Sequence, residues 1–89
     1  MKIKLELFGS SRDFSKNNFI EIEVKDNSSI EDLRNQIILY LKKRFQNNES
    51  FIKIVKSSAF CSDNNEIISD NYKITKDQKI AIIPPIGGG

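Results

Sequence analysis

Hydrophobic and polar residues alternate in two stretches of the N-terminal part of the chain. In residues 2–8 (KIKLELF) the apolar side chains of Ile3, Leu5 and Leu7 alternate with charged ones, and residues 19–24 (FIEIEV) repeat the pattern. A period of two places the apolar side chains on one face of an extended chain, so both stretches are predicted as half-buried strands. The residues between them (GSSRDFSKNN) are turn-like, which predicts an antiparallel pair joined by a loop.

The spacing of apolar residues then changes to that of a helix. Ser29 with Asp32 forms a predicted capping box, and Ser28 with Glu31 forms the same box one residue earlier. Acidic side chains in this first turn suit the positive end of the helix dipole. We expect the helix to fade near residues 46–48. Its apolar positions, at intervals of three or four, are Ile30, Leu33, Ile37 and Leu41.

Short apolar runs in the C-terminal half are predicted as further strands. Residues 51–55 (FIKIV) and 58–60 (SAF) are the third and fourth candidates. Residues 79–83 (KIAII) form the last strand, which is apolar enough to lie centrally in a sheet. The polar stretch 61–78 is typical of turns and short pieces. Four of its residues are expected to reach the core: Ile67, Ile68, Tyr72 and Ile74.

The order of these elements predicts an α+β domain. A mixed sheet with one main helix packed on one face accommodates every apolar face in the chain. This is the β-grasp (ubiquitin-like) arrangement, in which the first and last strands lie side by side at the centre of the sheet. We therefore expect one ubiquitin-like β-grasp domain over residues 1–83, from which residues 84–89 project as a flexible C-terminal tail.

Composition argues against several classes of active site. The 89 residues contain no histidine, so a His-based acid–base pair, triad or zinc site is not expected. Cys61 is the only cysteine and has no evident general base nearby, so we expect an inert thiol in a reducing compartment. Glu21 and Glu23 are expected on a solvated strand face. Residues 63–66 (DNNE) lack the spacing of a calcium loop, and no metal site is predicted.

Charge and hydropathy favour a cytoplasmic protein without a nucleic-acid or membrane partner. The net charge of +2 is small and the lysines are scattered, so nucleic acid is not an expected ligand. No apolar run approaches the roughly 20 residues that span a bilayer. The N-terminus is charged and alternating, so a signal peptide is not predicted.

The sequence closes on IIPPIGGG, an apolar strand end followed by two prolines, one isoleucine and three glycines. Pro84 and Pro85 end the strand and hold the exit extended, because proline fixes φ and cannot continue a ladder. Residues 84–89 reach about 20 Å when extended, and the glycines let a narrow channel close around the backbone. The α-carboxylate of Gly89 is a poor electrophile until a partner activates it, for example as an acyl adenylate that sulfur then attacks.

This ending resembles the Pro-Pro-x-x-Gly-Gly terminus of molybdopterin synthase small subunits, the sulfur carriers of molybdenum cofactor biosynthesis. Residues 7–14 (LFGSSRDF) resemble the family's exit from its first strand: an aromatic residue, a small residue, two variable positions, then Arg and an acid. Residues 29–37 (SIEDLRNQI) and 72–85 (YKITKDQKIAIIPP) resemble its helix start and its closing turn and strand. The resemblance spans most of the chain, and the tail is its most specific part.

The resemblance implies a role for the tail and names its partners. Gly88 and Gly89 form the reactive end, and Gly89 carries the thiocarboxylate that donates sulfur to a pterin precursor. ATP is used by an E1-like adenylating enzyme, and the chain itself binds no cofactor. A sulfur-donor protein and a large synthase subunit are the other partners, in a heterotetramer in which this chain is a non-catalytic, sulfur-donating subunit. The implied partner-binding residues are Phe8, Arg12, Ile83, Pro84, Pro85, Ile86 and Gly87.

The residues themselves leave one question open, and the chain departs from the family pattern at three points. Phe8 and Ile83 fit core packing as well as docking, since either face of a strand can bury an apolar residue. The family often has an aromatic residue in place of Ile83. The turn 75–78 (TKDQ) lacks the usual glycine, so Asp77 is expected in the left-handed conformation. The stretch 61–72 is longer than typical.

Other functions are compatible with the same features. A sulfur carrier for thiamin or tRNA thiolation shares the fold and the Gly-Gly end but generally lacks the proline pair. A ubiquitin-like modifier ends as an isopeptide on target lysines. A plain β-grasp binding module carries an inert tail.

Overall fold

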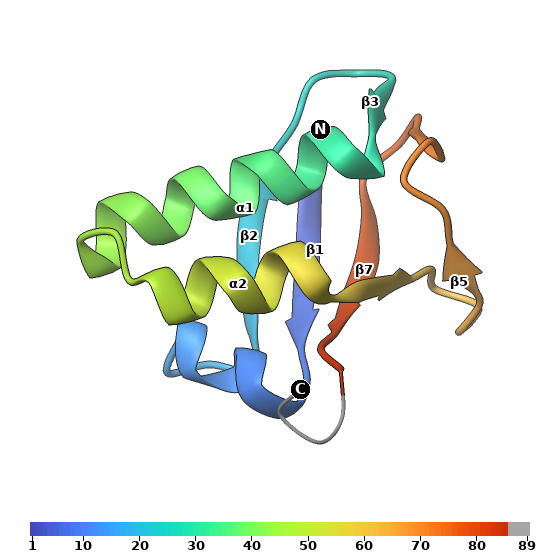
Figure 1. Ribbon diagram of the computed structural model, residues 1–89. Coiled ribbons are helices and arrows are strands. Elements are labelled where there is room, and N and C mark those ends of the chain that lie inside the picture. The colour runs from blue at the N-terminus through green and yellow to red at the C-terminus, as the bar shows by residue number, and fades with distance from the viewer. Residues whose placement is uncertain (86–89) are drawn as a thin grey trace.

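The computed structural model describes residues 1–85 of the chain. Two α-helices lie on one side of a twisted sheet, and a short 3₁₀-helix, η1, follows the first strand (Figure 1). In chain order the elements are β1 (Lys2–Leu7), η1 (Gly9–Phe14), β2 (Phe19–Glu23), β3 (Ser28–Ser29), α1 (Ile30–Phe45), α2 (Glu49–Ser57), β4 (Ala59–Cys61), β5 (Ile67–Ile68), β6 (Lys73–Ile74) and β7 (Gln78–Ile83).

The main sheet has the strand order β2-β1-β7-β4-β5. β1 and β7 run parallel, with Leu5 opposite Ile80, and the remaining neighbours are antiparallel, with Leu5 also opposite Ile20. β3 and β6 form a separate two-stranded pair. The prediction that the first and last strands lie side by side in the middle of a mixed sheet is confirmed, as is the α+β β-grasp arrangement.

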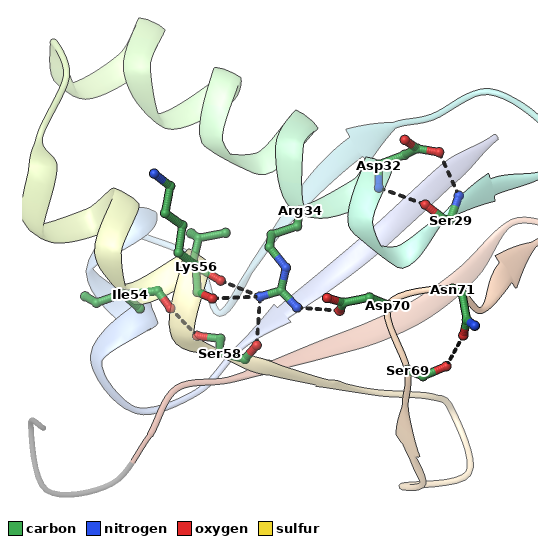
Figure 2. A network of polar contacts seen from close by, with 10 residues as sticks. Ser29, Asp32, Arg34, Ile54, Lys56, Ser58, Ser69, Asp70 and Asn71 are labelled. Atoms are coloured by element: carbon green, nitrogen blue, oxygen red, sulfur yellow. Dashed lines mark hydrogen bonds and ion pairs between the residues drawn. The ribbon is translucent and has the colours of Figure 1, made fainter.

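Helix α1 covers the sheet with one apolar face. Its inward side chains are fully or almost fully buried, together with the inward side chains of β1 and β7. The predicted capping box of Ser29 and Asp32 forms: the Ser29 hydroxyl accepts from the Asp32 N–H at 3.1 Å, and the Asp32 carboxylate accepts from the Ser29 N–H at 2.9 Å (Figure 2). The helix ends at Phe45, and Gln46 takes the left-handed conformation that closes it. The expected start and end of this helix are confirmed.

The prediction of a strand at residues 51–55 is wrong, because these residues belong to helix α2. Asn48 caps the helix by accepting a hydrogen bond from the Phe51 N–H at 3.2 Å. The Phe51 ring then packs against Phe14, with ring centres 5.0 Å apart, and against Phe45 at 4.9 Å. A short apolar run fits a strand or a buried helix face equally well. Aromatic contacts with η1 and α1 decide for the helix.

Two smaller predictions in the C-terminal half are also wrong. Ile67 is 77% exposed and does not reach the core. The other three residues behave as expected: Ile74 is buried, and Ile68 and Tyr72 are partly buried against the core. Asp77 is not among the residues of positive φ. Its carboxylate accepts a hydrogen bond from the Lys2 N–H at 2.9 Å instead, which ties this turn to the start of β1.

Arg34 joins α1 to the end of α2 and to the loop before β6 (Figure 2). One guanidinium nitrogen donates to the carbonyl oxygens of Val55 at 2.7 Å and Ser58 at 2.8 Å, and the other lies 2.6 Å from the Asp70 carboxylate. The guanidinium also lies 4.9 Å from the centre of the Phe60 ring. Arg34 therefore closes the C-terminus of α2 with a charged donor. Within the described residues, no helix has the length and apolarity to cross a membrane.

Candidate functional site

The face of the sheet turned away from the helices carries a row of small and apolar side chains. The strand register places Ala81 opposite Glu6 on one side and opposite Cys61 on the other, and Cys61 opposite Ile67. Residues directly opposite one another on neighbouring strands point to the same face. The row of small and apolar side chains therefore crosses β7, β4 and β5 on the open face, with the charged Glu6 of β1 at one end and the exposed Ile67 at the other.

Phe8 and Ile83 stand at the end of this face where β1 and β7 finish. Their side chains are 40% and 36% exposed, so the structure decides against core packing for both. With Cys61 and Ala81 they line a hollow of about 260 Å³. An exposed apolar hollow within a polar surround is the usual composition of a protein-binding surface. The polar residues around it are Glu6, Ser62, Asp63, Asn65 and Lys79.

The other end of the open face is charged. The Lys4 ammonium lies over the Phe19 ring, 4.5 Å from its centre, and Lys4 pairs with Glu21 across the β1–β2 ladder. Lys79 and Glu6, whose charged groups lie 3.8 Å apart, belong to the lining of the hollow itself. Glu21 and Glu23 are exposed, as predicted for a solvated strand face. The apolar end of the face is thus the end at which β7 finishes and the C-terminal tail begins.

The start of the tail lies against η1. Pro84 is buried and Pro85 is exposed. Gly9 has φ +56, a backbone conformation that favours glycine, and a Cβ at this position would lie 3.9 Å from the ring carbons Cδ and Cγ of Pro84. Four residues of the predicted site lie outside the described residues: Ile86, Gly87, Gly88 and Gly89.

The segment predicted as a plain loop contains η1, which is held on both sides. Ser11 and Phe14 are fully buried, and the Ser11 hydroxyl is bonded to the backbone of Phe8. Arg12 is exposed, as expected, and among residues 1–85 its guanidinium enters no ion pair. Its position on the helix next to Gly9 leaves it available to a partner that approaches the tail.

Sequence reasoning missed three residues of this surface. The alternation in residues 79–83 already places Ala81 with Ile83 on one face, opposite the buried Ile80 and Ile82, so Ala81 was within reach of a strand pattern. A strand pattern could not place Cys61 and Ile67 in the same way, because β4 and β5 are only three and two residues long. The expectation that the Cys61 thiol is inert stays a prediction.

Several solved structures share this architecture. SAMP1 (small archaeal modifier protein 1) from Haloferax volcanii superimposes with a TM-score of 0.68 at 14% identity, covering 100% of both chains. A putative molybdopterin converting factor subunit 1 from Pyrococcus furiosus gives 0.66 at 19% identity, covering 96% of this chain and 98% of that one. A chain in the complex of molybdopterin-converting factor subunits 1 and 2 from Helicobacter pylori gives 0.60 at 21% identity, with 100% of both chains covered. No curated protein matches the sequence.

At these identities the structural matches support the fold and leave the activity open. The family match is broader, because residues 5–89 fit the sequence model described as the ThiS family. That span includes the second half of β1, the residues that line the hollow beside Phe8 and the glycines that close the sequence. The chain belongs to the ThiS family, with the β-grasp fold of ubiquitin-like sulfur carriers.

Proposed function

We propose that this chain is a sulfur carrier that serves as the small subunit of molybdopterin synthase. The observation that supports this best is the position of the apolar hollow, which lies where β7 ends and the tail begins. A partner that docks at the hollow lies at the root of a segment that reaches about 20 Å when extended. Docking and delivery of Gly89 are then two parts of one binding event.

The chemistry takes place at the carboxylate of Gly89. In the active site of an E1-like adenylating enzyme this carboxylate attacks the α-phosphate of ATP and pyrophosphate leaves. Hydrosulfide supplied by a sulfur-donor protein then attacks the acyl carbon of Gly89, the acyl–phosphate bond breaks and AMP leaves, so that Gly89 carries a thiocarboxylate. ATP is bound by the adenylating enzyme, and the carrier supplies only the acyl group and the surface that presents it.

The surface suits a partner that must bind and later release the carrier. Phe8 and Ile83 present apolar area in a hollow, and apolar anchors at the centre of a surface commonly contribute most of the binding energy. Arg12, exposed on η1, is placed to pair with an acidic group beside the tail channel. The polar surround keeps the free protein soluble while the partner is absent.

The similarity to molybdopterin-converting factors supports the pterin pathway as the first candidate. One of the matched chains comes from a complex of subunits 1 and 2, which supports a large synthase subunit as the receiving partner. We infer that two carriers and two large subunits form the working heterotetramer, and that each carrier delivers its sulfur to a pterin precursor.

A second candidate is a ubiquitin-like modifier, and the similarity to SAMP1 supports it equally well. In that function the activated carboxylate of Gly89 is joined to a lysine amine of a target protein. The surface and the tail would be used in the same way up to the adenylate, so the two candidates differ in the nucleophile. A carrier for thiamin or tRNA thiolation differs only in the protein that receives the sulfur.

Intact mass spectrometry separates these functions. The protein is incubated with cell extract, ATP and a sulfur donor, and a mass gain equal to one oxygen-to-sulfur exchange is expected. No gain, or a gain that persists after Gly89 is deleted, contradicts the sulfur-carrier proposal. A pull-down then identifies the receiver: a large synthase subunit supports the pterin pathway, and a thiazole synthase contradicts it. Conjugates of high mass in place of the exchange favour the modifier.

A further inference from the structure

Phe8 is placed on the open face although the sheet does not hold its backbone. The β1–β2 ladder ends with Glu6 opposite Phe19, and the β1–β7 ladder ends with Leu7 opposite Ile82. Phe8 comes one residue later, with φ −128 and ψ 154, so it continues the extended line of β1 beyond its partners. Another group must therefore fix the direction in which its side chain projects.

That group is the side chain of Ser11. The Ser11 hydroxyl accepts a hydrogen bond from the Phe8 N–H at 3.0 Å and donates one to the Phe8 carbonyl oxygen at 2.6 Å. The Ser11 N–H also donates to the same carbonyl at 3.1 Å. Both polar groups of the Phe8 backbone are thus held by one residue. Ser11 is fully buried, so water has no access to replace its hydroxyl.

The same turn also lies beside Pro84, the first residue of the tail. Gly9 lies between Phe8 and Ser11 in sequence, at φ +56, and its Cα faces the ring of Pro84. Pro84 is buried and immediately follows β7. A change in the geometry of the Phe8–Ser11 turn therefore moves the surface against which Pro84 rests. The Ser11 hydroxyl therefore lies in a turn that adjoins both Phe8 and the start of the tail.

We propose that Ser11 is a positioning residue, whose hydroxyl fixes Phe8 on the open face and holds Gly9 against Pro84 where the tail leaves the domain. This inference rests on the function proposed above. Without the hydroxyl the part-buried Phe8 N–H loses its hydrogen-bond partner, and the turn relaxes until this group finds another. Phe8 is then no longer preorganised, and a partner must order it on binding.

The test compares Ser11→Ala with a matched neighbour, Ser10→Ala. Ser10 is exposed and belongs to the same η1. The rate of thiocarboxylate formation is followed by intact mass against carrier concentration, with cell extract, ATP and sulfide, well below the melting temperature of each variant. For Ser11→Ala we expect the half-saturating concentration to rise about tenfold with the maximal rate changed less than about twofold. Ser10→Ala is expected to match the unmodified protein.

A second measurement is independent of activity. Amide hydrogen exchange of Phe8 is expected to be slow in the unmodified protein, because Ser11 holds this N–H outside the sheet ladder, and fast in Ser11→Ala. A Ser11→Ala half-saturating concentration equal to that of Ser10→Ala overturns the proposal, as does an unprotected Phe8 amide in the unmodified protein. If Ser11→Ala does not fold at the assay temperature, the exchange rate of the Phe8 amide in the unmodified protein tests the proposal: a slow rate supports it and a fast rate overturns it.

The two proposals fail in different ways. If the unmodified protein gains no sulfur, the sulfur-carrier function falls and the positioning role falls with it. If the unmodified protein gains sulfur and Ser11→Ala gains it with the same half-saturating concentration, only the role of Ser11 is overturned.

Discussion

Phe8 and Ile83 lie side by side on the open face of the sheet, each one residue beyond a pair of the parallel β1–β7 ladder. Leu7 is opposite Ile82 in that ladder and both are buried, so the next residue on each strand turns to the other face. The two side chains line one hollow and are 40% and 36% exposed. Their apolar area is therefore free for a partner, and it contributes little to the core.

Replacing either residue should weaken docking and leave the fold intact. We expect Phe8→Ala and Ile83→Ala each to reduce affinity for the large synthase subunit about 10- to 30-fold, or about 1.4–2 kcal/mol. The free energy of unfolding should change by less than about 1 kcal/mol, because both side chains are already partly in water. Calorimetric titration and urea unfolding measure the two quantities. Leu39→Ala, an exposed apolar residue on α1, is the control and should alter neither; an equal loss of affinity there would argue against the open face.

Adding one residue after Gly89 should abolish sulfur loading without changing thermal stability. The added residue converts the Gly89 carboxylate, the proposed site of adenylation, into an internal amide and leaves the folded domain unchanged. The loading assay and a thermal melt are run on the same sample. Removing the extra residue with a specific protease should restore loading, and a parallel fall in melting temperature would mean that the tail is structural.

Arg34→Ala should destabilise the fold far more than Asp70→Asn. The Arg34 side chain is 14% exposed and serves the carbonyls of Val55 and Ser58, whereas Asp70 is 58% exposed. Loss of the charged donor should cost about 3 kcal/mol, which corresponds to a fall of roughly 10 °C or more in melting temperature. Loss of the half-exposed ion pair should cost less than about 1 kcal/mol. Equal effects in urea unfolding would assign the stabilisation to the ion pair instead.

The capping box predicts part of the acid sensitivity. The hydrogen bond from the Ser29 N–H is the largest influence that holds the pKa of the Asp32 carboxyl below its usual value. Hydrogen bonding with the Ser29 side chain is the second, and it lowers the pKa further. A carboxyl whose folded pKa is lowered stabilises the fold above its unfolded pKa of about 3.9. That stabilisation is lost as the pH falls through the lower folded pKa. The stability difference between the unmodified protein and Asp32→Ala should therefore be constant from neutral pH to about pH 5 and should shrink below about pH 4. A difference that does not depend on pH would contradict the role of the charge.

Local patterns in the sequence determined the parts of the fold that carry a clear period or a cap. The alternation around Leu5 and Ile22 defined β1 and β2, and the Ser29–Asp32 box defined the start of α1. These predictions are confirmed because each depends on residues close together in the chain. The proline pair likewise marked the end of β7 at Ile83, because proline cannot continue the ladder.

Tertiary structure alone decided the rest. The run at residues 51–55 became a helix because Phe51 packs on Phe14 and Phe45, a contact between three elements that no local period records. The exposure of Phe8 and the burial of Ser11 depend on where the β1 ladders stop, and that is set by strand partners far away in sequence. The sequence by itself pointed to the tail as the site of the proposed reactive group; the packing of η1 and β7 decided which surface lies beside the start of the tail. Local secondary structure follows from neighbouring residues, whereas the burial of a side chain depends on which distant segments of the chain pack against it.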